Sequence, residues 1–556
     1  MKKNVVLSLM IFFFVLIFIS YAEANKTSLK FEIFYPSDAH PEKTTGNEFI
    51  TGRAYVIISR NNEKELRFQT GYAGVPIWGE NIFSLKPGEA AVIDEESFGY
   101  PLRSIKEIPP GEYFVQGFIN LYSEFKRSDG HTIWAHNDQW EGQQWNRSPG
   151  NIYSDVIKVS IDPAKTKAIR LNCNHVIPPV EIPSDSEWVK RIKFESKILT
   201  DFWGRPMYLG ATILLPKDYD KHSDVYYPVN YVQGHFSLAA PHGFRTDDPG
   251  EKNRRGRRGY EFYKFWNSDK CPRMIAVTFQ HPCPYYDDSY AVNSQNVGPY
   301  GDAIMNELIP YIEEHFRVIR KPYARMLSGG STGGWESFAL QIFHPDFFGG
   351  TWTLCPDSVG FNWYEPVNIY EEKNAYYKEY EWIKVERPGR RDINGQVLTS
   401  RKDLFYYELA LGDKNRSCGN FGAFEAVYSP IAEDGYPKPL WNWLTGEIDH
   451  SVAEYWKENY DLFYHLEKNW SLIGPELVGK LHIYVGDMDT WYLNNSVVTL
   501  EKFLESTKDP YYAGVVKYGW RGTHCWGPRG AELIKLFEEH ITKNAPRGEN
   551  PSKWKY

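Results

Sequence analysis

The chain has few cysteines, little net charge and one long apolar run. Six cysteines in 556 residues are too few to hold a core of this size together, and their spacing matches no zinc site. The net charge of −8 is small for this length and gives no support for a nucleic-acid partner. Short repeats and low-complexity segments are also lacking. A globular protein of two or three domains remains, with 42% hydrophobic residues to fill its cores.

The apolar run stands at the beginning of the chain. Lys2 and Lys3 precede the run from Val5 to Ser20, and Ala22-Glu23-Ala24 follows it as an A-x-A cleavage pattern. An uncleaved anchor is the alternative, but the run is short for a bilayer span. We therefore predict a signal peptide over residues 1–24, a secreted or periplasmic protein, and no membrane partner after cleavage. Cys271 and Cys283 are the candidate disulfide pair.

Residues 28–162 have the pattern of an all-β domain. Segments such as "AYVIIS" and "DVIKVSI" are rich in β-branched residues, and the pairs Pro87-Gly88 and Pro110-Gly111 mark turns. The pattern predicts a sandwich-like domain, with residues 163–187 as a linker. One loop places tryptophans among polar side chains, which fits either a sugar-binding surface or a packed interdomain loop. These are Trp134, Trp140 and Trp145.

Strands and helices alternate from about residue 188 to 545. "KRIKFESKIL" and "MYLGATILLP" suggest a hairpin, and "PVNYVQGH", "RMIAVTFQH", "ARMLSGG", "GTWTLCPD" and "KLHIYVGD" read as buried strands. Between them, Ile304, Leu308, Ile312 and Phe316 recur at helical spacing. This alternation predicts an α/β fold with a largely parallel sheet and flanking helices.

The stretch "SGGSTGGW" lies between a strand and an amphipathic helix. It lacks the Gly-Lys-Ser/Thr of a phosphate loop, but Gly329 to Gly333 fit the G-x-S-x-G pattern of a nucleophile elbow. Such a turn strains the serine backbone and exposes its hydroxyl, and small neighbours let strand and helix approach. Ser331 is therefore the predicted nucleophile; the alternative is a structural helix cap.

A serine nucleophile needs a base and an acid that orients the base, which in this fold follow it in the order acid, then histidine. Asp489 and Asp487 follow the strand "KLHIYVG", and we favour Asp489 because Gly-x-x-Asp carries it past the strand end. His524, in the loop "RGTHCWG", is the predicted base. His540, the other histidine beyond the acids, belongs to a terminal helix.

The predicted oxyanion hole consists of two backbone amides, those of Thr332 and His235. Phe236 is a close alternative to His235 as a donor. Candidates for contact with substrate are Phe236, Asp357, Trp335 and Trp491.

Together, "PVNYVQGH", "NSQNVGPYGDAIMNELIPYIEEHF", "SGGSTGGW", "GDMD" and "GTHCW" resemble the putative-esterase (esterase D-like) family of the α/β-hydrolase superfamily. The resemblance covers about residues 190–540 and implies a serine esterase. Family members usually carry His-Gly after the third strand, whereas this chain has Gln233-Gly234-His235. A Trp- and Tyr-rich segment at about 360–475 is unusual, and we interpret it as a cap over the pocket.

These features predict an exported serine hydrolase that cleaves a small-molecule or glycan-linked carboxylic ester without metal or cofactor. A peptidase or an acyltransferase on the same fold is an alternative, as is a non-catalytic carbohydrate-binding protein with a degenerate hydrolase fold. Neither the acyl group, the alcohol nor the oligomeric state follows from the sequence.

Overall fold

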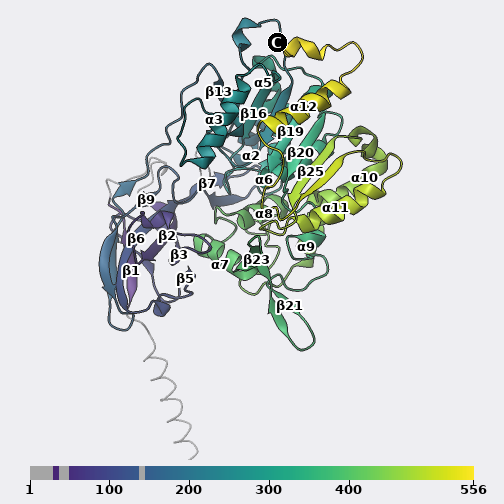
Figure 1. Ribbon diagram of the computed structural model, residues 1–556. Helices are drawn as coiled ribbons and strands as arrows, with labels where there is room; N and C mark the ends of the chain where they lie inside the picture. Colours follow the sequence, from purple (N-terminus) through teal and green to yellow (C-terminus); the bar gives the residue numbers. More distant parts are fainter. Residues whose placement is uncertain (1–28, 37–48, 137–143) are drawn as a thin grey trace, which may run out of the picture. The chain divides into compact units, whose positions relative to one another are not determined.

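The computed structural model describes residues 29–36, 49–136 and 144–556 (Figure 1). It divides into two compact units, Met1–Tyr122 with Gly150–Ile177, and Ser123–Pro149 with Pro178–Tyr556. The predicted signal peptide and Trp140 lie outside the described residues. Among the residues described, no helix is both long and apolar enough to span a bilayer.

Unit 1 is β-rich, as its sequence predicts. A three-stranded sheet has the order β11 (Ala168–Asn172), β1 (Lys30–Phe34), β4 (Ala91–Ile93). A seven-stranded sheet has the order β12 (His175–Val176), β9 (Ile152–Tyr153), β6 (Gly111–Leu121), β2 (Ile50–Ser59), β3 (Ile77–Leu85), β5 (Phe98–Tyr100), with β10 (Ile157–Ile161) also on β6. Residues of both sheets form one buried apolar cluster, which includes Phe31, Val56 and Leu171.

The boundaries of unit 1 differ from the predicted 28–162. Its strands β11 and β12 lie in the stretch predicted as a linker. The hairpin of β7 (Ser123–Lys126) and β8 (Thr132–Ala135) belongs instead to unit 2. There the backbone N–H of Trp134 donates to Tyr436 Oη at 2.8 Å, and Arg416 donates to the Trp134 carbonyl at 3.0 Å.

Unit 2 is built on one eight-stranded mixed sheet. Its order is β13 (Val189–Glu195), β14 (Tyr208–Leu214), β16 (Ile275–Gln280), β15 (Val229–Gln233), β19 (Arg325–Gly330), β20 (Gly350–Leu354), β25 (Leu481–Gly486), β26 (Val515–Gly519). The strands from β16 to β26 are parallel, while β14 is antiparallel to β13 and β16. The predicted hairpin thus pairs, but helix α2 (Lys197–Trp203) interrupts it, capped by Ser196.

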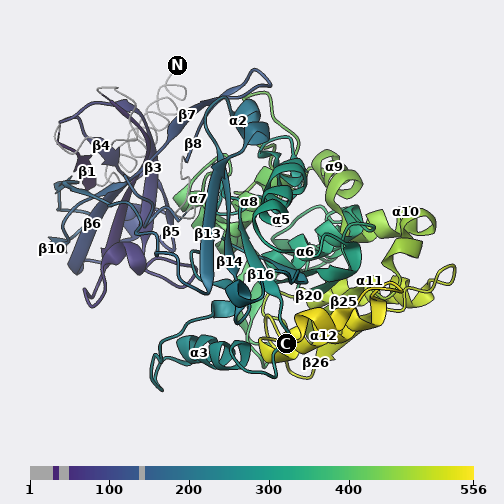
Figure 2. The ribbon, with the colours of Figure 1, turned by 90° about the horizontal axis from the view of Figure 1, so that it is seen from above.

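Helices cover both faces of this sheet (Figure 2). On one face lie α3 (Arg254–Trp266) and α12 (Ala531–Asn544), and on the other α5 (Ile309–His315) and α6 (Thr332–Phe343). A π-helical turn, η5 (Ile304–Leu308), joins α4 (Tyr300–Ala303) to α5. Ile304, Leu308 and Ile312 are buried, as their spacing predicts. Because the central strands are parallel, their carboxyl ends and the loops that follow gather at one edge of the sheet.

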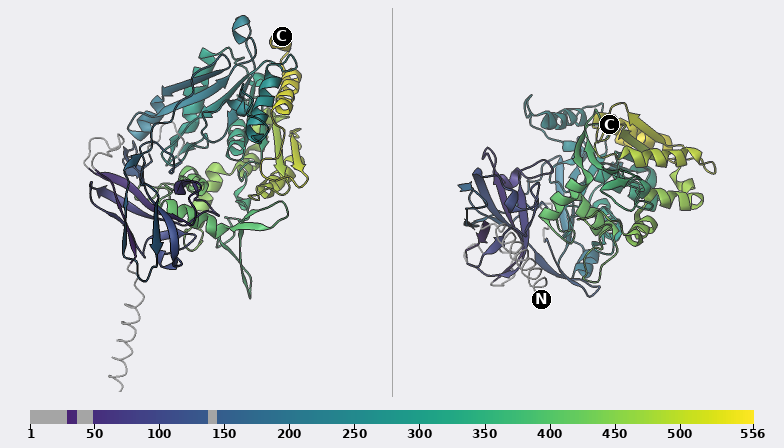
Figure 3. Two further views of the ribbon diagram at one scale, coloured as in Figure 1. Left: turned by 60° about the vertical axis from the view of Figure 1, so that its left-hand side comes forward. Right: turned by 90° about the horizontal axis from the view of Figure 1, so that it is seen from below.

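A long excursion separates β20 from β25. It comprises β21 (Tyr377–Glu379), β22 (Lys384–Glu386), β23 (Pro388–Arg391), β24 (Val397–Ser400), α7 (Arg401–Leu411), α8 (Asn420–Tyr428) and α9 (His450–Tyr460). Helix α10 (Leu462–Leu477) then packs on α6 and leads into β25, followed by α11 (Asn494–Ser506). The hairpin of β21 and β22 projects from the rest of unit 2 (Figure 3).

The excursion begins and ends at one hydrogen-bonded neck. The N–H of Phe463 donates to the carbonyl of Val359 at 2.8 Å, and the N–H of Phe361 donates to Asp461 Oδ2 at 2.7 Å. Residues 362–460, called the excursion from here on, therefore leave the sheet framework and return to it at the same place. Their interior is aromatic, since Trp441 and Trp456 are fully buried.

Candidate active site

Ser331 lies between the end of β19 and the start of α6, as the elbow pattern predicts. Its backbone has φ 60° and ψ −125°, a strained conformation for a residue with a side chain. The flanking glycines are required by close backbone contacts: a Cβ on Gly329 would lie 2.0 Å from the Gly333 carbonyl, and one on Gly333 would lie 2.2 Å from the Gln233 carbonyl. The local sequence thus allows strand and helix to meet and leaves Ser331 half-buried.

His524 and Asp489 meet Ser331 at this edge of the sheet. Asp489 follows β25, and His524 follows β26. His524 Nε2 lies 3.0 Å from Ser331 Oγ, and its Nδ1 lies 2.9 Å from Asp489 Oδ2. The buried Asp489 carboxylate is fixed through Oδ1, which accepts the N–H of Trp491 at 2.9 Å. An imidazole between a hydroxyl and a carboxylate can take the hydroxyl proton. Ser331, His524 and Asp489 therefore have the geometry of a serine nucleophile activated by a general base.

The structure separates the alternatives left by the sequence. Asp489, and not Asp487, contacts His524, while one carboxylate oxygen of Asp487 is buried without a hydrogen bond. His540 lies on α12, where its Nε2 is 2.8 Å from the Gly349 carbonyl and its ring packs on Trp352. His540 is thus held away from Ser331 by contacts of its own.

His524 lies between anionic groups. Burial by itself lowers its pKa, but hydrogen bonds to Asp489 and Cys525, together with their charges, raise the pKa to about 10. These contacts therefore favour the protonated form of the imidazole.

Asp357 lies in direct contact with the nucleophile. Ser331 Oγ is 3.3 Å from its Oδ1, and the hydroxyls of Thr332 and Tyr290 donate to its Oδ2 at 3.0 and 3.2 Å. Burial raises the pKa of Asp357 to about 6, although the charge of His524 and these hydrogen bonds lower it. Among the four residues suggested for substrate contact, Asp357 accepts a hydrogen bond from the Ser331 hydroxyl.

The loop after β15 lies against the elbow, because the Gln233 carbonyl approaches Gly333. The amides of Thr332 and His235 therefore belong to neighbouring segments, and their role as oxyanion donors stays a prediction. The His235 ring points to two acids, with Nδ1 3.1 Å from Asp287 Oδ1 and 2.7 Å from Asp288 Oδ2. Burial opposes the charge of His235, but the two carboxylates raise its pKa well above the usual value.

Two groups bring together side chains that could ligate a metal ion: His235 with Asp287 and Asp288, and Cys355 with His524 and Cys525. In each group the ligand atoms lie within 4.8 Å of one another.

The other suggested substrate contacts differ in burial. Trp335 is fully buried on α6 and packs against Tyr290 and Tyr428, so the prediction that it binds substrate is wrong and its role is core packing. The helical spacing in "WESFALQIF" already favoured a buried face there. Phe236 and Trp491 are half-buried, and the guanidinium of Arg390 lies 4.9 Å from the Trp491 ring centre.

Several residues at the site carried no signal in the sequence. Tyr290 and Arg391 reach it from a loop and from β23, and Arg391 Nε donates to the Asp489 carbonyl at 2.9 Å. Cys355 accepts the N–H of Ser331 at 3.3 Å. Only Cys525 could have been suspected, since it adjoins His524. The candidate pair Cys271 and Cys283 is not bonded, and both are free thiols. Trp134 is half-buried and Trp145 buried, so these two do not form an exposed sugar-binding surface.

Residues 207–392 match the family model described as "Putative esterase". This match covers about a third of the chain, agrees with the resemblance seen in the sequence and supports a carboxylic ester hydrolase. It spans the elbow, Asp357 and the beginning of the excursion, whereas Asp489 and His524 lie beyond it.

Solved structures of esterases are also similar to the chain. A ferulic acid esterase shares 14% identity, with 64% of this chain and 96% of that chain covered and a TM-score of 0.34. An S-formylglutathione hydrolase from Staphylococcus aureus shares 15% identity over 64% and 97%, with a TM-score of 0.32. One from Agrobacterium tumefaciens shares 12% over 65% and 98%, with a TM-score of 0.31. No curated protein sequence matches the chain.

Proposed function

We propose that this protein is an exported serine esterase that hydrolyses a small-molecule carboxylic ester through Ser331, His524 and Asp489. The observation that carries the proposal is the pair of contacts on one imidazole, 3.0 Å to Ser331 Oγ and 2.9 Å to Asp489 Oδ2. The elbow backbone of Ser331 and the esterase family match support the same chemistry.

In the proposed reaction, Ser331 Oγ attacks the ester carbonyl while neutral His524 takes the serine proton. Asp489 holds the imidazole in the tautomer that leaves Nε2 free to accept that proton. The amides of Thr332 and His235 stabilise the oxyanion. His524 then protonates the leaving alcohol, and a water molecule, activated by the same imidazole, releases the acid from Ser331.

The excursion is proposed to cap this site. Arg391, from β23, donates to the carbonyls of Asp489 and Asp487 at 2.9 and 3.3 Å. From α8, Asn420 accepts the hydroxyl of Tyr286 at 2.7 Å, and the ring of Phe424 packs on Tyr290. These contacts fasten the excursion to the loops around Ser331, where it can exclude water and select the substrate.

Export is proposed from the sequence of residues 1–24, which has a basic start, an apolar run and an A-x-A site. Secretion or a periplasmic location would place the esterase where ester substrates arrive from outside the cell. Detection of the mature chain beginning after Ala24 in the culture or periplasmic fraction tests this part.

Labelling with a fluorophosphonate probe tests the catalytic role. We expect the wild-type protein to be labelled on Ser331 and to hydrolyse p-nitrophenyl acetate, and we expect Ser331→Ala to lose both. Ser506→Ala, an exposed serine at the end of α11, is the matched control and retains both. Labelling that persists in Ser331→Ala would refute the assignment. Peptide substrates and added acyl acceptors, assayed in parallel, distinguish an esterase from a peptidase or an acyltransferase.

A further inference from the structure

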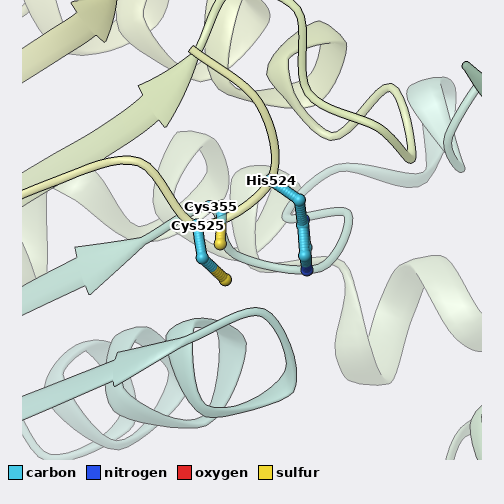
Figure 4. Close-up of side chains that lie close together, drawn as sticks. All are labelled: Cys355, His524 and Cys525. Carbon is cyan, nitrogen blue, oxygen red and sulfur yellow. The ribbon is translucent and has the colours of Figure 1, made fainter. Parts of the chain in front are cut away.

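Two cysteines lie beside the candidate active site on loops far apart in sequence. Cys355 directly follows β20, and Cys525 directly follows His524 (Figure 4). Their sulfur atoms and a ring nitrogen of His524 lie within 4.8 Å of one another. Both sulfurs also reach the elbow: Cys355 Sγ accepts the N–H of Ser331 at 3.3 Å, and Cys525 Sγ lies 3.3 Å from where a Cβ on Gly330 would be.

The backbone fixes both cysteines in unusual conformations. Cys355 has φ 39° and Cys525 has φ 59°, in the left-handed region that residues with side chains seldom adopt. Such conformations persist where the surroundings determine them, so the surrounding structure fixes the backbone at both cysteines.

The two thiols differ in protonation. The hydrogen bond from Cys355, together with that from His524 and its charge, outweighs burial and lowers the pKa of Cys525 to about 5. Burial raises the pKa of Cys355 well above its usual value. The result is a thiolate beside a thiol, which is the arrangement that thiol–disulfide exchange requires. By contrast, burial raises the pKa of both Cys271 and Cys283 to about 12, which makes these thiols inert at neutral pH.

We propose that Cys355 and Cys525 are a redox site in which a disulfide forms beside the triad, and that the oxidised form is the active esterase. This inference rests on the proposed function. With a small disulfide such as oxidised glutathione as oxidant, the Cys525 thiolate attacks one sulfur and releases one glutathione thiolate. Cys355 then loses its proton and displaces the second glutathione thiolate. One S–S bond replaces another. One glutathione thiolate takes up the proton from Cys355, and the other takes up the proton that His524 releases once the Cys525 thiolate is gone.

The charges around His524 explain why oxidation of Cys355 and Cys525 would activate the esterase. The groups facing the imidazole are the Asp489 carboxylate from the loop after β25, Cys355 and Asp357 from the segment after β20, the neighbouring Cys525, and Ser331 on the elbow. In the reduced form, Asp489 and the Cys525 thiolate hold a proton on His524, and a protonated imidazole cannot accept the serine proton. A disulfide carries no charge, so its formation removes one of the two anions and frees the base.

The disulfide also links two segments that the sheet does not hold together directly. Strand β25 lies between β20 and β26. A covalent bond from Cys355 to Cys525 therefore spans the loop that carries Asp489 and ties the His524 loop to the segment beside the elbow. Oxidation thus fixes the position of the base as well as its charge.

The test uses the full-length protein with a chelator present throughout, equilibrated in reduced or oxidised glutathione. We expect intact mass to fall by about 2 Da on oxidation, and peptide mapping to join the Cys355 and Cys525 peptides. Activity on p-nitrophenyl acetate at pH 7 should rise at least about tenfold, and the rise of kcat/KM with pH should move to lower pH. Absence of the cross-link, or a cross-link that lowers activity or leaves it unchanged, overturns the proposal.

A matched pair of variants separates charge from cross-linking. Cys525→Ser removes the thiolate, so activity at pH 7 should be high and insensitive to glutathione. Cys355→Ser retains Cys525 and a hydrogen-bond donor but prevents the disulfide, so activity should stay low in both states. Cys271→Ser should respond like the wild type. Identical behaviour of Cys525→Ser and Cys355→Ser contradicts the proposal, and the wild-type titration decides the matter if either variant does not fold.

Fluorophosphonate labelling keeps this proposal distinct from the proposed function. No labelling of Ser331 in either redox state defeats the esterase assignment itself. Equally fast labelling in both states defeats only the redox switch. In a separate assay begun without chelator, activation of the reduced protein on adding the chelator, with no change in mass, would instead indicate inhibition by a thiol-bound metal and would overturn the disulfide.

Discussion

The buried carboxylate of Asp357 makes a quantitative prediction about stability. Burial raises its pKa from 3.8 to about 6 in the folded protein. The folded state then holds the proton more tightly than the unfolded state, so stability falls as pH rises between these values. The raised pKa of Asp357 lowers the free energy of unfolding by about 3 kcal/mol at pH 8 and by about 1 kcal/mol at pH 4.5. Asp357→Asn removes this cost, and its amide oxygen still accepts the Thr332 and Tyr290 hydroxyls. The variant should therefore be more stable than wild type, by an amount that grows with pH.

Urea unfolding of wild type and Asp357→Asn at pH 4.5 and pH 8, followed by tryptophan fluorescence, measures this difference. Asp220→Asn is the control, because Asp220 is exposed and should give the same stability as wild type at both pH values. A gain in Asp357→Asn that is independent of pH, or a loss of stability at pH 8, would show that Asp357 is held ionised and would refute the reasoning.

Two further predictions concern the triad. Ser331→Ala and Ser331→Gly should both be inactive. The Gly variant should be more stable than the Ala variant by about 1 kcal/mol in urea unfolding, because φ 60° and ψ −125° strain every residue with a side chain. Equal stability of the two variants would mean that the elbow is not strained. Asp489→Asn should lower kcat about 10⁴-fold, whereas Asp487→Asn should stay within about tenfold of wild type. Steady-state kinetics of the two variants compares them, and equal losses would leave Asp489 without a special role.

Local features were predictable because local physics determines them. The elbow at Ser331 requires glycine at its flanking positions. A Cβ at Gly329 or Gly333 would lie only 2.0 or 2.2 Å from a backbone carbonyl oxygen. The chain order of Ser331, Asp489 and His524 follows from parallel strands whose carboxyl ends share one edge of the sheet. Both the elbow and the chain order of the triad thus depend on short stretches of sequence.

Features that depend on long-range packing were not predictable. The strands of β7 and β8 look like those of unit 1, but a strand pattern does not specify the sheet it joins, and this hairpin belongs to unit 2. Cys355 and Cys525 come together only through the spatial order β20, β25, β26, which their own neighbourhoods do not encode. Trp335 does not bind substrate as predicted, because helix α6 turns its side chain into the core.

The neck at which Phe463 bonds Val359 and Phe361 bonds Asp461 has a consequence for how such an enzyme changes over generations. Everything between these points can be shortened, lengthened or exchanged in a single genetic event without altering the order of any strand in the sheet. Ser331, Asp489 and His524 all lie outside that interval. With the excursion as the proposed cap, substrate selection can change through a segment that contains none of these three residues.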